Sequence, residues 1–472
     1  MEQLHDERLA RYSTAMRNEK PDRVPIRPFV AEFAATYAGY TCQEVTQDYE
    51  KAFDAARKCA ADFDWDAVVG NMVYVWAGLT QAIGLTYYGM PGIEVPPDMG
   101  FQYREPPEDQ AFMHPDEYDA LIEDPTGFLY NVWLPRVAAP VCEIGSPVTF
   151  DNNLSFVRGG LAMLQYFMGF GTQAARLKAE CGMPGAIAGI LKAPLDIIAD
   201  KLRGYIGLTM DILKQPDKVL AACEALAPHL LHTALAGADP TGTVPISIWM
   251  HRGCVPFVST ETFDTVYWPT LKPIIESIWA AGHQTLFYAE GDWNHHLDAF
   301  AELPAGSIIY HIDQADPMEV HEKLGQKFCL SGGLPNFLLG YGTPDQVREC
   351  CKKLIDTIGA DGGYILDASA IVQNVAKVEN IRAMTDFTRE YGVYSDGHAT
   401  PPTPPEPDIT PEQAAAAMPD RATALAPGVC CPWERFRDSL PGLCGDEQLV
   451  KTIWESNDAL ANMYIWHCLL SF

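Results

Sequence analysis

The sequence predicts an α/β protein folded as a closed (β/α)8 barrel of eight parallel strands, with insertions and a C-terminal helical extension. Short apolar segments alternate with helices of 10–20 residues, and at least five such units follow one another between residues 245 and 391. This alternation is typical of parallel βα units. Residues 20–395 also provide enough chain for eight units, which need about 250 residues before insertions. A doubly wound open sheet is the alternative architecture.

The first third of the chain is expected to combine helices with one buried strand. Residues 1–20 predict an amphipathic helix, and residues 42–62 predict another helical stretch. The run Asp66–Val69 has the apolar composition of a buried strand. Residues 76–115 are rich in glycine, proline and aromatic side chains, so we expect a long loop with little regular structure there. A helix is expected over 116–122.

Strands and helices alternate more regularly after residue 145. Thr343 and Pro344 are typical of a helix start, and Gly359 is typical of its end. Segment 182–189 is expected to be a loop of small residues. The expected strands are 146–150, 245–250, 285–289, 307–310, 328–331 and 363–367. The expected helices are 196–213, 217–236, 259–281, 317–324, 343–358 and 377–391.

Composition and charge exclude several classes of protein. Sixty-two acidic residues against 33 basic ones give a formal charge of −29. This argues against nucleic-acid binding, which needs a basic surface, and against docking on anionic lipid. The 13 cysteines have no framework spacing, which predicts a reducing compartment. With neither a signal peptide nor an apolar run of membrane-spanning length recognised, we predict a cytoplasmic enzyme.

The chain is expected to divide into a barrel domain over 1–395, a proline-rich linker over 396–411 and a C-terminal extension over 412–472. The extension predicts helical stretches at 412–417 and about 446–470. Its last residues, MYIWHCLLSF, are apolar. We therefore expect the extension to pack on the barrel or on a partner subunit, which makes a homodimer possible.

Residues capable of chemistry follow three consecutive predicted strands. His251 follows PISIWM, Glu290 follows the strand over 285–289, and His311 follows the strand over 307–310. Because the carboxyl ends of parallel strands meet at one rim of a barrel, these side chains are candidates for a common site.

Several segments carry a resemblance to a known family. They are SGGLPNFLLGYGTPDQVRECCKKLI, GADGGYIL, VENIRAM and TREYG, together with the earlier KPDRVPIRP and DWDAVV. In these segments the chain resembles the uroporphyrinogen decarboxylase superfamily, and most closely its corrinoid-dependent methyltransferase branch, over residues 8–395. The resemblance implies a TIM barrel whose site lies at the carboxyl ends of the strands.

The sequence departs from the family in two places. The Arg-rich N-terminal motif with which the decarboxylases hold porphyrinogen carboxylates is not found. The Cys ligands of the thiol-activating methyltransferases are replaced, with Glu290 at the first position and the run Asp367–Ala370 at the later one. Glu290 and His311 have the spacing of a Glu and a His in the O-demethylase methyltransferases, which remove methyl groups from phenyl methyl ethers.

The resemblance therefore implies a zinc-dependent methyltransferase. Zn²⁺ would activate the ether oxygen of a small methoxylated, aromatic compound, and the methyl acceptor would be the Co(I) corrinoid of a separate protein. The implied zinc ligands are Glu290 and His311, with the third open among His251, Asp313, Tyr288 and Cys254. The implied catalytic residues are Glu290, His311 and Asp313, and the implied substrate-binding residues are His251, Arg252, Tyr288, Asp292, Trp293 and Tyr341.

Two alternatives remain open from the sequence. One is a metal-free lyase or decarboxylase of the same superfamily. The other is a barrel that no longer catalyses and serves as a binding subunit, since the Cys ligands are absent.

The adjacent pair His295 and His296 is expected to lie on the surface.

Overall fold

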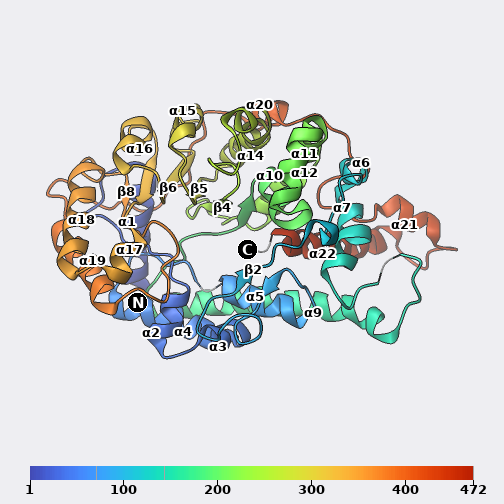
Figure 1. Cartoon of the computed structure of the whole chain (residues 1–472), viewed down its shortest axis with the longest axis horizontal. Helices are drawn as coiled ribbons and strands as arrows, with labels where there is room; N and C mark the ends of the chain where they lie inside the picture. The colour runs from blue at the N-terminus through green and yellow to red at the C-terminus, as the bar shows by residue number, and fades with distance from the viewer. Residues whose placement is uncertain (71, 143, 471–472) are drawn as a thin grey trace.

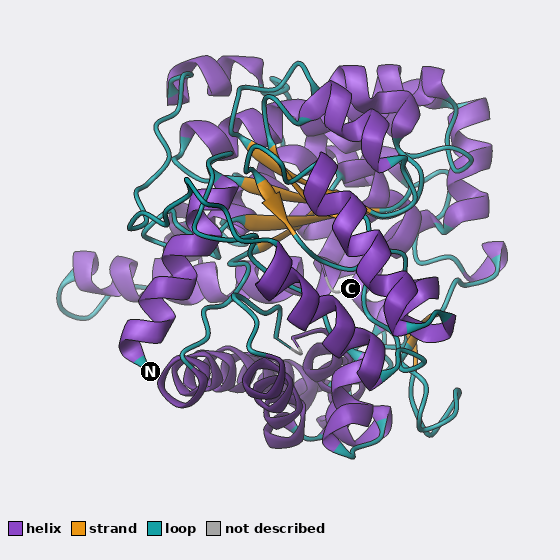
Figure 2. Cartoon of the chain, turned by 90° about the vertical axis from the view of Figure 1, so that its left-hand side faces the viewer, coloured by secondary structure: helices purple, strands orange, loops and turns teal. Residues whose placement is uncertain are grey.

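The computed structural model describes residues 1–70, 72–142 and 144–470. Its centre is a six-stranded parallel sheet in the order β3-β4-β5-β6-β7-β8, and helices surround these strands in the two cartoon views (Figures 1 and 2). A separate antiparallel pair, β1–β2, lies outside it. The strands are β1 (Tyr88–Gly89), β2 (Gln102–Tyr103), β3 (Ile190–Lys192), β4 (Ile246–Met250), β5 (Thr285–Ala289), β6 (Ile308–Ile312), β7 (Cys329–Gly332) and β8 (Tyr364–Ile365).

Two further segments close the sheet into a barrel. Parallel bridges join Ile26 to Leu366 and Phe29 to Val69, and a third joins Val68 to Gly185, just before β3. With the segments around residues 26–30 and 66–69 as two additional staves, the barrel has eight parallel members. The prediction of a (β/α)8 barrel is confirmed, and the alternative of an open doubly wound sheet is wrong.

The barrel interior is filled by side chains that alternate with outward-facing ones. Phe29, Trp249 and Tyr288 pack edge to face or tilted against one another, with ring centroids 4.4–5.9 Å apart. Helix α1 (Glu2–Met16) packs against this interior cluster. Its Tyr12 hydroxyl donates to the Ala186 carbonyl at 3.0 Å, so the N-terminal helix closes the end of the barrel opposite the strand carboxyl ends.

Helices cover the outside of the barrel (Figure 1). Their N-termini carry the expected caps: Thr343 forms a capping box with Gln346, and the Ser259 hydroxyl accepts from the Thr262 N–H. The helices are α2 (Glu32–Ala38), α3 (Cys42–Gln47), α4 (Tyr49–Phe63), α5 (Met72–Ala82), α6 (Tyr118–Glu123), α7 (Pro125–Phe128), α8 (Leu134–Val137), α9 (Phe150–Cys181), α10 (Pro194–Ile197), α11 (Tyr205–Lys214), α12 (Pro216–Ala236), α13 (Thr260–Thr262), α14 (Trp268–Ala280), α15 (Leu297–Phe300), α16 (Pro317–Leu324), α17 (Asn336–Tyr341), α18 (Pro344–Thr357) and α19 (Val378–Tyr391).

Some expectations for individual elements are wrong. Residues 146–149 form no strand, and Phe150 instead begins the 32-residue helix α9. The segment 182–189 contains the beginning of the stave that continues into β3, because the Ala186 N–H donates to the Val68 carbonyl. The stretch 76–115 includes most of α5 and the β1–β2 pair. The helix expected over 42–62 is two helices, because the side chain of Asp48 caps a new one.

Helix α12 is the one helix of the described chain that is long and apolar enough to span a membrane. A core helix passes the same test, and 56% of its most apolar window is buried inside the protein. Val219, Leu226 and Leu230 on α12 are fully buried. The helix is therefore explained by packing against the barrel and α14.

The C-terminal extension packs on the barrel domain. It contains α20 (Pro411–Ala417), α21 (Trp433–Ser439) and α22 (Glu447–Leu470), and α22 lies beside α7 in Figure 1. The buried indole of Trp466 stacks on His229 of α12, with ring centroids 4.8 Å apart. Its N–H donates to the Thr126 hydroxyl at 3.3 Å. Apolar residues of this extension up to Leu470 are thus buried within the same chain, and residues 471 and 472 lie outside the described part.

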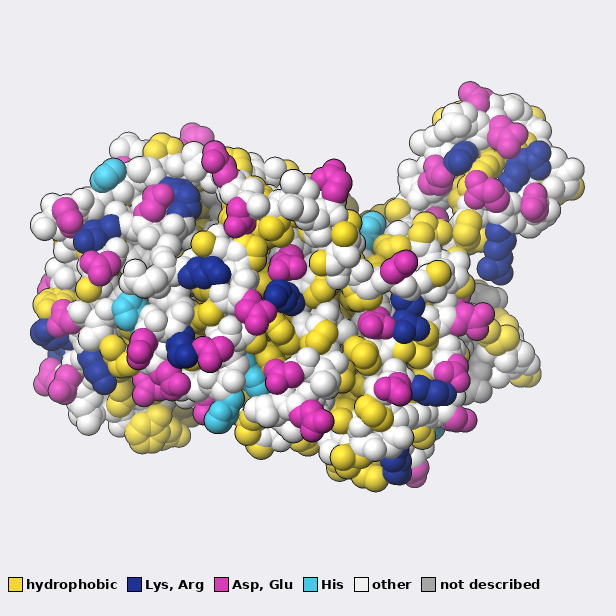
Figure 3. Space-filling view, turned by 90° about the horizontal axis from the view of Figure 1, so that it is seen from above, with side chains coloured by type: hydrophobic (Ala, Val, Ile, Leu, Met, Phe, Trp, Pro, Cys, Tyr) yellow, Lys and Arg dark blue, Asp and Glu magenta, His cyan; other side chains and the backbone are white. Residues whose placement is uncertain are grey.

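The surface reflects the acidic composition. Seen from above, Asp and Glu side chains are scattered across the whole visible face, with apolar side chains between them (Figure 3). Such a face repels anionic polymers.

Closure of the barrel depends on one buried carboxylate, that of Asp66. It accepts from the Ile26 N–H at 2.9 Å and pairs with Arg11 and Arg23, each at 2.7 Å. We predict that Asp66→Asn lowers the free energy of unfolding by about 3 kcal/mol, because it breaks a buried ion-pair network. Asp22→Asn is the matched control, since Asp22 also pairs with Arg11 but is 45% exposed. Urea unfolding should show a loss below about 1 kcal/mol for the control, and equal losses would contradict this role.

Candidate active site at the carboxyl ends of the strands

The strand register places three predicted site residues at one level of the barrel mouth. Tyr288 of β5 pairs with Trp249 of β4 and with His311 of β6. Two positions further along the same staves come His251, Glu290 and Asp313. Because side chains in a strand alternate between faces, these three continue the inward-facing rows of the barrel.

His251 and Glu290 form an ion pair at this mouth. Nδ1 of His251 lies 2.6 Å from Oε2 of Glu290, and the two side chains are 26% and 29% exposed. Burial lowers the pKa of His251, but the charge and hydrogen bond of Glu290 outweigh it, so this pKa is raised above its ordinary value. The pair can therefore hold a proton at a position that a small molecule can reach.

Asp313 lies next to this pair. Its Oδ2 accepts from the Gly291 N–H at 2.8 Å. Burial and the neighbouring charge of Glu290 raise the pKa of Asp313 to about 6. Asp313 can thus exchange a proton close to neutral pH.

A network of charged residues supports His251 from the β3 side. It starts at Lys192, the last residue of β3, whose Nζ lies 2.8 Å from Oδ2 of Asp200. Asp200 also accepts from Nε of Arg252 at 3.0 Å. Asp196 in α10 accepts from the backbone N–H of Arg252 at 2.8 Å. The backbone after β4 is therefore held by two carboxylates.

The two carboxylates of this network have opposite pKa shifts. Burial raises the pKa of Asp200, but Lys192, His251 and Arg252 more than reverse this and bring it below its usual range. The pKa of Asp196 is raised to about 6, because burial dominates and Asp200 adds repulsion. Asp200 is therefore a fixed negative charge, whereas Asp196 can take up a proton.

His311 does not join Glu290. It is fully buried inside the barrel, and its ring stacks on Tyr288 with centroids 4.2 Å apart. Its Nε2 lies 2.9 Å from the Ser369 carbonyl, and its Nδ1 lies 3.0 Å from the Ser331 hydroxyl. A carbonyl only accepts, so Nε2 must carry the proton and Nδ1 must accept. Both ring nitrogens of His311 are thus engaged with protein groups.

The cause is the register of β5 and β6. His311 is level with Tyr288, and Glu290 lies two residues further toward the mouth, or about 6.6 Å along the strand. Burial and the neighbouring Arg27 lower the pKa of His311 well below its ordinary value. A neutral, stacked and sealed imidazole is typical of a structural histidine.

Arg27 and Asp367 form a second buried group beside His311. The Arg27 guanidinium lies 3.2 Å from Oδ2 of Asp367, and both side chains are fully buried. It also donates to the Ser331 hydroxyl at 3.0 Å. Burial raises the pKa of Asp367 to about 7, although Arg27 acts to lower it. This group ties the first barrel stave to β7 and β8 in the interior.

The residues present do not fit the predicted zinc site. Zinc needs free lone pairs from three protein ligands, and Nε2 of His311 is a donor while its Nδ1 already accepts a hydrogen bond. No group of three His, Cys, Asp or Glu side chains in the described parts of the chain is arranged to hold a metal ion. Cys254 is no substitute, because burial raises the pKa of its thiol to about 11. The pairing of Glu290 with His311 is therefore replaced by that of Glu290 with His251.

The predicted substrate-binding residues are dispersed. Arg252 stays near the mouth, its guanidinium held by Asp200 and 4.9 Å from the Phe257 ring centre. Tyr288 is buried in the interior. Trp293 is fully buried, and its N–H donates to the Glu290 carbonyl at 2.8 Å.

The two remaining predicted substrate-binding residues, Asp292 and Tyr341, are exposed. Asp292 is exposed and accepts from the Asn294 N–H at 3.0 Å. Tyr341 is 65% exposed, in α17 after β7. Of the histidine pair expected at the surface, His295 is exposed, but His296 is buried against Phe263, with ring centroids 3.7 Å apart.

The sequence analysis missed Lys192, Asp196 and Asp200. Their signal was present: a lysine ends a short apolar strand, and two aspartates four residues apart face the same side of the following helical segment. Arg27 lies in the segment KPDRVPIRP, whose sequence alone indicates no role for it.

We predict that Glu290→Gln lowers the pKa of His251, because it removes the carboxylate that stabilises the imidazolium. The measurement is a pH titration of ¹³C-labelled histidine by NMR, with the His251 signal assigned from a His251→Asn sample. Glu302→Gln, an exposed glutamate far along the same βα unit, is the control. An unchanged His251 titration in Glu290→Gln would show that the ion pair is absent in solution.

Comparisons with known proteins agree with this architecture. Residues 167–391 match the family model of uroporphyrinogen decarboxylase (URO-D). No curated protein matches the chain. Among solved structures, a methyltransferase from Methanosarcina mazei is similar in fold, with a TM-score of 0.53 at 15% sequence identity, covering 82% of this chain and 98% of that one. The resemblance to the uroporphyrinogen decarboxylase superfamily seen in the sequence is confirmed.

Proposed function

We propose that the protein is a methyltransferase that takes a methyl group from a small methoxylated, aromatic compound at the barrel mouth. The observation that carries the proposal is the reachable ion pair of His251 and Glu290 at the carboxyl ends of β4 and β5. In barrels of this class the active site lies at this end. The similarity in fold to a methyltransferase supports the same class of reaction.

His251 would act as a general acid. Glu290 keeps the imidazole protonated and holds it through Nδ1, which leaves Nε2–H to donate to the ether oxygen of the substrate. An electron pair of the methyl acceptor forms the new bond to the methyl carbon. The electrons of the broken C–O bond stay on the oxygen, which takes the proton of His251. The products are a phenol and the methylated acceptor.

The methyl acceptor would be the Co(I) corrinoid of a separate protein, bound as a substrate. An apolar rim supports its docking. Phe337 and Tyr341 in α17 are 69% and 65% exposed, and Val375 in the loop after β8 is 50% exposed. They line a shallow cavity of about 270 Å³, and exposed apolar groups of this kind favour protein contacts.

Zinc has no role in this proposal, because the described residues do not assemble its ligands. The alternative of a metal-free lyase would need a cation that reaches a substrate carboxylate. Arg27 is sealed in the interior, Lys192 and Arg252 are already paired with Asp200, and the imidazolium of His251 is already paired with Glu290. Methyl transfer with proton donation is therefore the function that the site supports best.

We predict that His251→Asn slows methyl transfer at least about 100-fold, the usual contribution of a general acid. The assay measures methylcobalamin and catechol formed from cob(I)alamin and 2-methoxyphenol. His295→Asn, an exposed histidine in the loop after β5, is the matched control and should keep wild-type activity. The wild-type rate should fall as pH rises through the raised pKa of His251, because only the protonated imidazole donates.

Three results would contradict the proposal. One is full activity of His251→Asn. Another is one zinc per chain in the wild type that Glu290→Gln loses, measured by elemental analysis, since it would restore a metal site. The last is turnover of a carboxylated substrate with no methyl transferred, which would favour the lyase.

We further propose that two copies of the chain associate through α9. Apolar side chains recur along this helix with alternating spacings of four and three residues, the pattern of a helix that packs on another helix. In a chain of charge −29, only Arg158 is charged between residues 152 and 175, so two copies can meet here without repulsion. The side chains are Phe150, Leu154, Val157, Leu161, Leu164 and Met168, five of them 42–76% exposed.

We predict that Leu161→Glu converts a dimer into a monomer, because it places two like charges in the contact between the copies. Light scattering after size exclusion should give twice the 52.0 kDa of the chain for the wild type and that mass once for the variant. Ile93→Glu is the control, because Ile93 is similarly exposed, at 57% against 56% for Leu161. A monomeric wild type, or a dimeric Leu161→Glu, would contradict the interface.

A further inference from the structure

A second cavity lies far from the mouth, on the outer side of β3 near the start of that strand. Its volume is about 330 Å³, within the range of sites that hold small ligands. It is bounded by β3, by the C-terminal end of α12 and by side chains of α5, α9 and α22. The lining residues are Trp76, Tyr166, Phe167, Phe170, Ile187, Ala188, Gly189, Ile190, Thr233, Ala236, Gly237, Met463 and His467.

Aromatic rings form one wall of this cavity. Trp76 meets Tyr166 edge to face, with ring centroids 5.2 Å apart, and Phe167 meets His467 in the same way at 5.1 Å. None of the lining residues is Asp, Glu, Lys or Arg. A charged ligand would lose its hydration there without gaining an ionic partner, so the cavity suits a neutral molecule. A flat aromatic ring can continue the edge-to-face contacts.

Besides the hydroxyls of Tyr166 and Thr233, two further polar groups belong to side chains that line the cavity. The indole N–H of Trp76 is buried and meets no acceptor among the described residues. Nδ1 of His467 lies 2.8 Å from the Met463 carbonyl, so it carries the proton. Burial lowers the pKa of His467, which keeps the ring neutral and leaves Nε2 as an acceptor. The cavity thus combines one donor with one acceptor.

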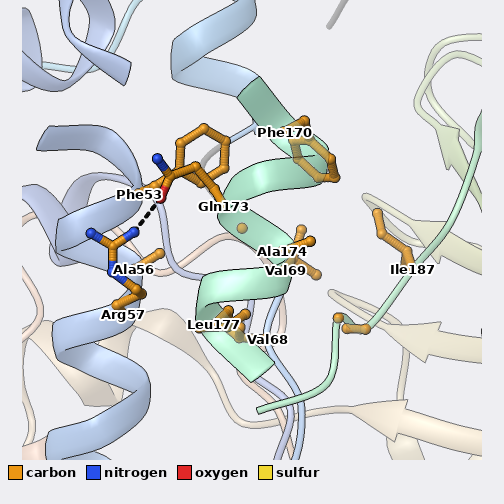
Figure 4. Close-up of a pocket in the computed structure, with 13 residues that line it drawn as sticks. Phe53, Ala56, Arg57, Val68, Val69, Phe170, Gln173, Ala174, Leu177 and Ile187 are labelled. Atoms are coloured by element: carbon orange, nitrogen blue, oxygen red, sulfur yellow. Dashed lines mark hydrogen bonds between the residues drawn. The ribbon is translucent and has the colours of Figure 1, made fainter. Parts of the chain in front are cut away.

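The C-terminal extension is needed to form this cavity. Met463 and His467 belong to α22, which lies outside the segment 167–391 that matches the family. A smaller cavity of about 120 Å³ adjoins it along α9 and shares Phe170 and Ile187. In the smaller cavity Arg57 is hydrogen-bonded to Gln173 (Figure 4). Of these two cavities, only the larger one is therefore lined without a charged side chain.

From this geometry we infer that the larger cavity binds a neutral, flat aromatic molecule with one hydroxyl group, of the size of a two-ring phenol. Its rings would pack against the wall formed by Phe170 and the Trp76–Tyr166 pair, whose Tyr166 and Phe170 rings lie 6.3 Å apart. Its hydroxyl would accept from the Trp76 N–H and donate to Nε2 of His467. This site differs from the barrel mouth in position and in charge, so the inference stands whether or not the proposed methyl transfer is correct.

The test is calorimetric titration of the full-length protein with 2-naphthol. We expect saturable binding at one site. Trp76→Phe keeps the ring but removes the donor, so it should weaken binding about five-fold, the loss of one hydrogen bond. Ala188→Phe fills the cavity and should abolish binding. The 2-naphthoate anion, which has the same rings and a charge, should not bind.

Matched controls separate this site from others. Trp454→Phe also removes an indole N–H in the C-terminal extension, one that donates to the Cys431 carbonyl, and it should bind 2-naphthol like the wild type. His467→Phe removes the acceptor and should weaken binding even if Ala188→Phe fails to fold, which circular dichroism would reveal. Absence of 2-naphthol binding, wild-type affinity in both Trp76→Phe and His467→Phe, or equal binding of 2-naphthoate would overturn the inference.

Discussion

The whole site depends on the closure of the barrel by two staves that pair with their neighbours through few hydrogen bonds. The first stave pairs with Leu366 and the second with Gly185, and the buried carboxylate of Asp66 holds both by accepting from the Ile26 N–H and by pairing with Arg23. Closure brings the carboxyl ends of all eight staves to one rim. It also fixes which residues share a level, and therefore which side chains can act together.

Register explains why one predicted pair formed and the other did not. His251 and Glu290 both lie two residues beyond a paired position, Trp249 with Tyr288, so they meet at the mouth. His311 is itself paired with Tyr288, so it lies deeper, in the packed interior. Glu290 and His311 are 21 residues apart in the sequence. This spacing does not show how deep each side chain lies in the barrel, because it includes the helix and loops between the two strands. Only the alignment of β5 with β6 places an imidazole at the rim or in the core.

Much of the fold could be predicted from the sequence, for physical reasons. Strands β4 (Ile246–Met250) and β5 (Thr285–Ala289) are mostly apolar runs, each followed by a polar residue. The helix that begins after Thr343 has a capping side chain, a proline at its first position and a glycine after its end. Helix α9 was missed because it is only weakly amphipathic and contains four glycines, at 159, 160, 169 and 171.

The site was only half predictable. His251, Glu290 and Asp313 were recognisable as polar residues at strand ends, but Lys192 and Asp200 gain their role from contacts between segments that the sequence does not pair. His251 receives a raised pKa from Glu290, while Asp200 receives a lowered one from Lys192 and Arg252, so neighbouring groups hold opposite charges at the mouth. His251 can therefore donate a proton while Asp200 stays charged and keeps its contacts with Lys192 and Arg252.

The most direct test of this account is a crystal structure obtained after soaking with zinc, with anomalous data collected at the zinc edge. The account predicts that His311 keeps Nε2 within hydrogen-bonding distance of the Ser369 carbonyl and that His251 stays paired with Glu290. No anomalous peak should lie between Glu290 and His311. A peak bridging those two residues, with His311 turned away from Ser369 toward the mouth, would contradict it.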